Sequence, residues 1–206
     1  MKNLEIIDSA SDADIARWLE RRLSAALTSR KGPVTITVPG GSTPFPIMEK
    51  LLERDLDWSR LVVWPGDDRI VPEDHEASNT GKLRALFEPA GAEVVTLSVM
   101  EAVPHFDLAW LGMGADGHIA SLFPNTNPRA DEVQSIVRLT PDPLPPEAPF
   151  DRITLTMPSL LDSDALVFVI RGDDKRTVFD DAVAGNNDLP VARLLRAARQ
   201  PVTCFA

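Results

Sequence analysis

The sequence predicts an α/β fold, in which a single domain over residues 1–206 places helices on both faces of a mostly parallel, Rossmann-like sheet as three α/β/α layers. Short apolar runs alternate along the chain with segments whose apolar residues recur at helical spacing. Such alternation implies parallel strands that are joined by right-handed crossovers and covered on both faces. The length of 206 residues supports a sizeable core and suits one large domain.

The first half of the chain shows this alternation. A strand over residues 4–7 precedes a helix that Ser9 or Ser11 can cap. Residues 34–38 are rich in β-branched side chains and form the second predicted strand. The other expected elements of this half are a helix over 45–56, strands over 61–64 and 93–98, and a helix that Ser78 or Asn79 caps and that runs through Leu86.

The second half contains a proline-rich segment, residues 141–149, among further strands and helices. This segment cannot donate enough backbone hydrogen bonds for the interior of a sheet, so we expect an ordered surface connection and not a domain linker. The elements predicted around it are strands over 106–111, 135–139, 152–157, 165–170 and 201–205, and helices over 158–161, from Lys175 onward and over 189–198.

Three closely spaced glycines after the strand at 106–111 predict a tight turn that leads into a helix. Gly112, Gly114 and Gly117 let the backbone approach a ligand, and His118 follows them directly. At the start of a helix the positive end of the dipole disfavours the charged imidazole, so His118 is expected to act as a proton acceptor. Asp116 can orient that imidazole or bond the backbone of its own turn, and both roles stay open.

Two other interpretations fit the same turn. Residues 112–117 match G-x-G-x-x-G, and Asp131 or Glu132 lies about where a dinucleotide fold places its ribose-binding acid. That acid should end a second strand, whereas residues 124–132 are polar and loop-like, which argues against a nicotinamide site. Alternatively His118 only caps a helix, but three glycines, a neighbouring aspartate and a position at a strand end favour a functional site.

A second candidate motif follows the strand at 34–38. Gly40 and Gly41 allow backbone N–H groups to face inward, and Ser42 and Thr43 add hydroxyl donors before a proline that begins the next helix. This pattern is typical of a loop that binds an anion, and an ordinary turn capped by Thr43 is the alternative. No Gly-Lys-Ser/Thr follows, so the segment is not a Walker P-loop.

Charged residues follow two further strands. Asp67, Asp68 and Arg69 come just after the strand at 61–64, and Arg69 can contact a phosphate or a carboxylate with its fork of donors. A solvated charged loop is the alternative here. Lys175 follows the strand at 165–170 in the same way. Because ligands of parallel sheets bind at the carboxyl ends of strands, we expect these residues at one site.

Composition limits the classes of partner. Lys and Arg number 21 against 31 Asp and Glu, and the formal net charge of -10 argues against nucleic acid or an anionic membrane surface as partner. Cys204 is the only cysteine, so no intrachain disulfide can form. The amino terminus has no apolar signal core and no stretch approaches the length of a membrane span. These features predict a cytoplasmic protein.

Six motifs occur together in an order and spacing that are known from one family. The motifs are Gly40-Gly-Ser-Thr-Pro44, Asp67-Asp-Arg69 followed by Ser78-Asn79, the run from Gly112 to Pro124, Arg152-Ile-Thr-Leu-Thr156, Gly172-Asp-Asp-Lys175 and Leu189-Pro190. This ordered set resembles the 6-phosphogluconolactonase family. The chain departs from the family pattern at Asp68, where glutamate is usual, and between Val95 and Phe106, where a helix is normally found.

The resemblance implies hydrolysis of 6-phosphogluconolactone to 6-phosphogluconate, the second step of the oxidative pentose phosphate pathway, with neither a metal nor an organic cofactor. It implies His118 as the general base with Asp116 beside it, and a small sugar phosphate as the only partner. A monomer is compatible with the sequence, and the oligomeric state stays open. The substrate-binding residues implied by the motifs are Gly40, Gly41, Ser42, Thr43, Asp67, Arg69, Gly114, Arg152 and Lys175.

Two other functions are compatible with parts of the pattern. Glucosamine-6-phosphate deaminase is similar in the Gly-Ser-Thr loop and the Asp-Gly-His-Ile-Ala element. Its pattern has tyrosine where this chain has Arg69 and glutamate where it has Phe123, and a phenyl ring cannot relay protons. A non-catalytic sugar-phosphate sensor would keep Ser42, Thr43 and Lys175 without needing His118, but the sequence shows no DNA-binding segment or basic face.

Overall fold

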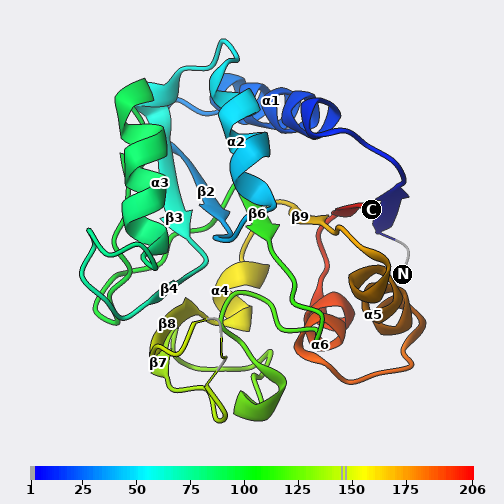
Figure 1. The fold of residues 1–206 in the computed structure, drawn as a ribbon. Helices are drawn as coiled ribbons and strands as arrows, with labels where there is room; N and C mark the ends of the chain where they lie inside the picture. Colours follow the sequence, from blue (N-terminus) through cyan, green and yellow to red (C-terminus); the bar gives the residue numbers. More distant parts are fainter. Residues whose placement is uncertain (1–2, 145, 147) are drawn as a thin grey trace.

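The computed structural model describes residues 3–144, 146 and 148–206 and contains a seven-stranded sheet. All neighbouring strands in this sheet are parallel, in the order β1-β10-β9-β6-β2-β3-β5 (Figure 1). The predicted mostly parallel α/β sheet is therefore confirmed. Its strands are β1 (Leu4–Ile7), β2 (Val34–Val38), β3 (Leu61–Pro65), β5 (Glu93–Val94), β6 (Leu108–Leu111), β9 (Leu166–Val169) and β10 (Val202–Phe205).

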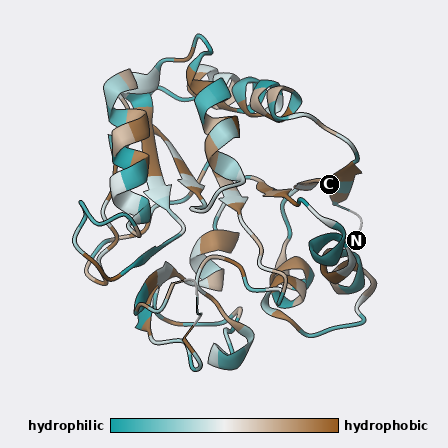
Figure 2. Cartoon of the chain, viewed as in Figure 1, coloured by the Kyte–Doolittle hydropathy of each residue, from teal (hydrophilic) through white to brown (hydrophobic). Residues whose placement is uncertain are grey.

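Helices cover both faces of the sheet, which gives the three predicted layers. Side chains of β6 alternate between two hydrophobic clusters, with Trp110 in the first and Leu111 in the second. Figure 2 shows the strands of this sheet as mostly hydrophobic and the helices as a mixture of hydrophobic and hydrophilic residues. The first cluster includes residues of α1 (Asp12–Ser29), α2 (Pro44–Leu52) and α3 (Asn79–Phe87), and the second includes residues of α4 (Met157–Leu161), α5 (Asp173–Ala184) and α6 (Pro190–Ala197).

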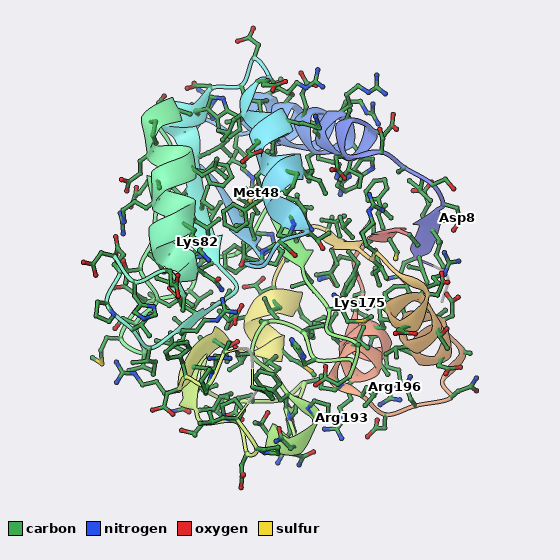
Figure 3. The ribbon with its side chains drawn as sticks, in the orientation of Figure 1. Asp8, Met48, Lys82, Lys175, Arg193 and Arg196 are labelled. Carbon is green, nitrogen blue, oxygen red and sulfur yellow. The ribbon has the colours of Figure 1, made fainter. Side chains whose placement is uncertain are left out.

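The local sequence explains where α1 begins and which residues of the other helices are buried or exposed. Ser11 caps α1 in a capping box with Asp14, so the second of the two predicted cap residues is the one used. Met48 of α2 is fully buried in the first cluster, whereas Lys82 on α3 and Arg196 on α6 are exposed (Figure 3). This separation of apolar and charged faces is what fixes the helices on the sheet.

A second, three-stranded sheet lies beyond the carboxyl ends of β2 and β3 (Figure 1). It consists of β4 (Asp67–Arg69), β8 (Arg152–Leu155) and β7 (Ile136–Leu139), paired antiparallel. The strands at 135–139 and 152–157 were predicted, but no strand was predicted at residues 67–69, and the alternative of a solvated charged loop there is wrong. Three charged residues carry no strand pattern of their own; they are extended because they pair with β8.

One predicted helix and the ends of two other predicted elements need the largest corrections. No helix follows the glycine turn: the segment from Gly112 to Phe123 forms only isolated bridges, Met113 with Ile119 and Ile119 with Leu122. A left-handed backbone at Gly117 and Ala120, with φ values of 76° and 49°, prevents a regular helix there. The strand expected over 93–98 ends at Val94, and the helix expected over 45–56 ends at Leu52.

Two further expectations concern the proline-rich connection and helices that could span a membrane. In the proline-rich connection, positions 145 and 147 lie outside the described residues. Among the described helices, none combines the length and the apolar character that crossing a bilayer requires.

Candidate active site

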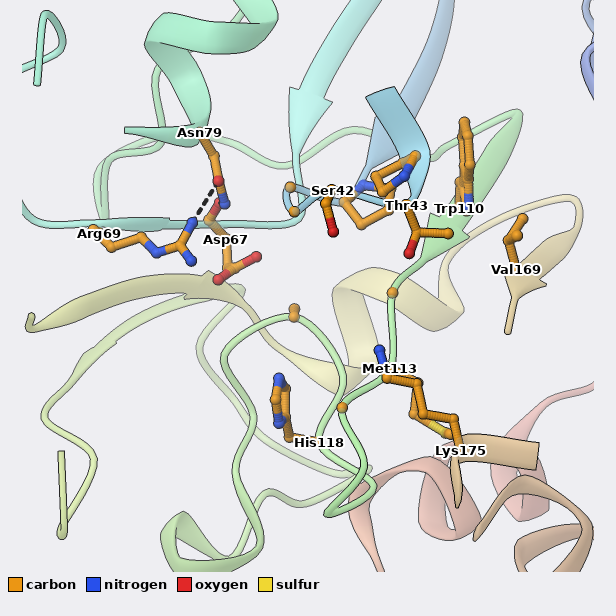
Figure 4. A pocket seen from close by; sticks show the side chains of 17 residues that line it. Ser42, Thr43, Asp67, Arg69, Asn79, Trp110, Met113, His118, Val169 and Lys175 are labelled. Carbon is orange, nitrogen blue, oxygen red and sulfur yellow. Dashed lines mark hydrogen bonds between the residues drawn. The ribbon is translucent and has the colours of Figure 1, made fainter. Parts of the chain in front are cut away.

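A cavity of about 280 Å³ opens at the carboxyl ends of four neighbouring strands, β9, β6, β2 and β3. The direction in which strands are added to the sheet reverses between β2 and β6. On one side of this point β2 is followed by β3, and on the other side β6 is followed by β9. Ligands of open α/β sheets bind in the crevice at such a reversal. Of the site residues predicted from sequence, the ones that line this cavity are Gly40, Gly41, Ser42, Thr43, Asp67, Arg69, Gly114, His118 and Lys175 (Figure 4).

The loop after β2 presents unoccupied hydroxyl groups to the cavity. Pro44 is the first residue of α2, and Thr43 precedes it with helical backbone angles and no side-chain capping bond. Within the part of the chain that is described, the hydroxyls of Ser42 and Thr43 donate to no protein acceptor. The alternative in which Thr43 serves only as a cap is therefore disfavoured, and both hydroxyls are available to an anion at the N-terminus of α2.

His118 and Asp116 form a hydrogen-bonded pair at the end of the loop that follows β6. The imidazole Nδ1 lies 2.6 Å from Asp116 Oδ1, and the same oxygen accepts the His118 backbone N–H at 3.2 Å. Asp116 thus holds the ring and also bonds its own turn. Partial burial raises the pKa of Asp116, but the bonds from His118 outweigh it and keep this pKa below its usual range. In the neutral tautomer whose Nδ1 donates to the carboxylate, Nε2 is the nitrogen that can accept a proton.

The His118 loop is held by α6 and by its own amides, and not by a helix of its own. The Gly117 carbonyl accepts a hydrogen bond from the Val191 N–H at 3.1 Å, and a Cβ at Gly117 would come within 2.8 Å of Leu189. The Gly114 N–H donates to the His118 carbonyl at 3.0 Å. The predicted helix dipole therefore does not act on His118. The Gly114 amide, having a partner inside the loop, does not point to a ligand.

Arg69 and Lys175 reach the cavity from opposite sides (Figure 4). Arg69 Nη1 donates to the Asn79 side-chain oxygen at 2.6 Å. Lys175 lies in the first turn of α5, and within the described residues its ammonium group has no carboxylate partner. The cavity therefore offers two separate cationic groups, one beside Asp67 and the other beside the Met113 end of the glycine loop (Figure 4).

Among the described residues, Asp67 is the one carboxylate that lines the cavity. Its Oδ2 accepts a hydrogen bond from Ser121 at 2.5 Å, and Ser121 is almost fully buried. Burial raises the pKa of Asp67, while the Ser121 hydrogen bond and the nearby Arg69 oppose that rise. Arg69 and His118 both lie near Asp67, and their charges act against the rise in pKa that burial causes.

Comparison with known proteins gives the same family that the motifs resemble. The family described as glucosamine-6-phosphate isomerases/6-phosphogluconolactonase matches residues 8–95 and 88–203. The chain belongs to this family.

Several relatives in this family are named 6-phosphogluconolactonase. The 6-phosphogluconolactonase of Helicobacter pylori is 32% identical over 98% of this chain and 95% of that protein. That of Pseudomonas aeruginosa is 34% identical over 91% and 89%. The solved structure from Shewanella baltica has a TM-score of 0.81 at 26% identity over 98% and 96% of the two chains. The structure from Thermotoga maritima, with a TM-score of 0.81 at 23% identity over 98% and 97%, shows the same fold.

One residue that the resemblance to the 6-phosphogluconolactonase family assigned to the substrate lies outside the cavity. Arg152 is 3% exposed and donates to the backbone oxygens of Phe150 and Ala148 at 2.7 Å each. It pairs with Arg69 across β4 and β8. Burial and the charge of Arg69 lower the pKa of Arg152. Its contacts support the loop before β8, and its side chain does not line the cavity.

Two residues of this family member reach the site although sequence reasoning gave them no role there. Phe123 packs against His118, with ring centroids 4.7 Å apart and the planes inclined by 40°. Asn79 lines the cavity and contacts Arg69. In the sequence, Phe123 marks a difference from the deaminase pattern and Asn79 is a possible cap. Only the three-dimensional structure brings them to His118 and Arg69.

Proposed function

We propose that this chain hydrolyses 6-phospho-D-glucono-1,5-lactone to 6-phospho-D-gluconate, the hydrolytic step of the oxidative pentose phosphate pathway, with water activated by His118. The observation that carries this proposal is the Asp116–His118 pair, whose 2.6 Å bond leaves the second imidazole nitrogen free at the edge of a cavity with anion-binding groups. Family membership and the names of the relatives support the same substrate.

In this proposal the phosphate binds between the Ser42-Thr43 loop and Lys175. The N-termini of α2 and α5 both open on the cavity, and each favours an anion. The hydroxyls and the lysine provide the donors. A phosphate held there directs the sugar ring across the cavity towards His118 and Arg69, which lie away from Lys175 (Figure 4).

The chemical step needs a base and a donor for the developing oxyanion. His118 removes a proton from water as it attacks the lactone carbonyl, an assistance worth roughly 10²- to 10⁴-fold. Asp116 keeps the ring oriented and stabilises the imidazolium that forms. Because the Gly114 and Gly117 amides donate within their own loop, Arg69 is the donor that we assign to the oxyanion. The strained ester carries its own leaving group, so no covalent intermediate is required.

The contact between Phe123 and His118 favours this reaction over deamination of an amino sugar phosphate. Ring opening and amine loss need a relay of protons, and the ring that packs on the imidazole at a centroid distance of 4.7 Å has no titratable group. The tight Asp116–His118 bond also argues against a sensor, because binding alone has no use for an oriented base.

An assay with freshly generated 6-phosphogluconolactone tests the proposed function directly. The purified protein should accelerate acid release well above the spontaneous hydrolysis, which is measured in parallel and subtracted. Non-phosphorylated gluconolactone should be a poor substrate, since phosphate binding positions the carbonyl. A rate no higher than the spontaneous one would refute the proposal.

Replacing Lys175 by Ala is expected to weaken binding of 6-phosphogluconate roughly ten- to hundred-fold, the range that corresponds to one lost charged hydrogen bond. The reason is that Lys175 is the cation on the phosphate side of the cavity. Isothermal titration calorimetry of the variant and the parent gives the comparison. Lys82→Ala on the exposed side of α3 is the matched control. Equal affinity of the Lys175 variant and the parent would exclude Lys175 from the phosphate site.

A further inference from the structure

We propose that Asn79 is the residue that positions Arg69 for the reaction, and that the buried carboxylate of Asp68 holds Asn79 in its place. The inference rests on the proposed function, because it assumes that Arg69 meets the charge that develops on the lactone carbonyl.

The side-chain amide of Asn79 is fixed in one orientation. Asn79 is 2% exposed, and its Nδ2 donates to the backbone oxygen of Asp67 at 2.9 Å. That bond turns Oδ1 towards Arg69, whose Nη1 donates to it at 2.6 Å. Within the described residues this oxygen is the only acceptor that the Arg69 guanidinium has, and the buried Nε of Arg69 has no partner. The direction of the guanidinium therefore depends on Asn79.

Asp68 fastens the start of α3, and with it Asn79, to β4. Its Oδ1 accepts the backbone N–H groups of Arg69 at 2.7 Å and of Asn79 at 2.6 Å. Its Oδ2 accepts the Thr80 N–H at 2.9 Å and the Ser78 hydroxyl at 3.2 Å. A carboxylate that accepts four hydrogen bonds at a helix N-terminus resists displacement. Asp68 itself does not line the cavity, so it acts only through these neighbours.

Asn79 also sets the distance between the two halves of the site. A Cβ at Gly40 would lie 2.1 Å from Asn79 Oδ1, so the amide occupies the space that a side chain at position 40 would need. One side chain thus contacts the loop that follows β2 and the guanidinium that β4 carries. The phosphate side and the carbonyl side of the cavity are held in register through this amide.

A double-mutant cycle on Asn79 and Arg69 tests the inference with the intact chain. Asn79→Ala is expected to lower kcat roughly ten- to hundred-fold, as for a lost hydrogen bond to a charged group. Arg69→Ala should lower it by about 10²- to 10³-fold, as for a lost oxyanion donor. The double variant should be no slower than Arg69→Ala alone, because Asn79 then has nothing to position. Affinity for inorganic phosphate, followed by NMR titration, should not change in Asn79→Ala.

Thr80→Ala is the matched control, since Thr80 is equally buried in the same helical turn but, among the described residues, its side chain makes no hydrogen bond to Arg69 and does not line the cavity. Its kcat should equal that of the parent. A double variant whose loss is the product of the two single losses would overturn the proposal, as would a Thr80→Ala variant as slow as Asn79→Ala. If Asn79→Ala does not fold, Asn79→Ser, which is polar but too short to reach Arg69, completes the same cycle. A parent that does not hydrolyse the lactone refutes the proposed function, whereas an active parent with independent losses refutes only the positioning role.

Discussion

His118→Asn is expected to lower kcat by about 10²-fold or more and to leave the affinity for 6-phosphogluconate unchanged. The asparagine amide has a similar reach and can keep a bond to Asp116, but it cannot take a proton from water near neutral pH. In the parent protein kcat/KM should fall on acidification, because a protonated imidazole is no longer a base. The Asn variant should lack this acid limb. Steady-state kinetics as a function of pH and calorimetry with the product measure the two parts.

His105→Asn provides the control for this experiment. His105 precedes the amino-terminal end of β6, the end opposite to the cavity, and contacts Asp162 and Asp164. This variant should therefore keep both kcat and the acid limb. If His118→Asn shows normal kcat and an intact acid limb, His118 is not the base. Asp67 would then be the candidate, because it lines the cavity, whereas the oxygens of Asp68 are occupied by four donors.

Gly114→Ala should abolish most of the activity by displacing the base without touching its chemistry. A Cβ at position 114 would lie 2.2 Å from His118 Cε1 and 2.6 Å from Asp116 Oδ1. Non-bonded carbon atoms approach only to about 3.5 Å, so the imidazole has to leave its position. The expected loss in kcat is about 10²-fold, similar to that of His118→Asn, since both remove an oriented base. Measuring kcat together with product affinity distinguishes this local effect from unfolding.

Gly32→Ala is the matched control, because a Cβ at position 32 meets no atom within 4 Å. It should behave as the parent in both measurements. A Gly114→Ala variant with kcat near the parent value would mean that the loop shifts to admit the methyl group and that the imidazole is not held as tightly as the Asp116 bond indicates.

The sequence predicted the elements whose signal is local. Apolar runs identified the strands of the main sheet, and Ser11 and Ser78 were recognisable caps. The loops that carry Ser42, His118 and Lys175 could be assigned to one edge because parallel strands end together. What could not be predicted depends on partners distant in the chain. Asp67 to Arg69 become a strand only through β8, more than 80 positions away.

In the candidate site, too, features with a local sequence signal could be predicted and features that depend on distant contacts could not. The residue types around the cavity could be read from the motifs, but their roles depend on contacts. The helix expected after His118 is absent because Gly117 and Ala120 take left-handed angles, with Gly117 held against α6. Arg152 carries the same charge as Arg69 and sits directly opposite it, yet it supports a loop instead of facing the cavity. No spacing in the sequence distinguishes these two arginines.

The order of strands also has a consequence for how the chain folds as it is synthesised. β10 lies between β9 and β1, and Leu4 of β1 pairs with Val202. A nascent chain therefore emerges from the ribosome with its first strand unpaired and with the outer edge of β9 open until the final strand arrives. The four strands that carry the cavity, β9, β6, β2 and β3, are already available before that moment. During this interval the exposed edge of β9 can pair with another chain, so its protection rests on the prompt insertion of residues 202–205.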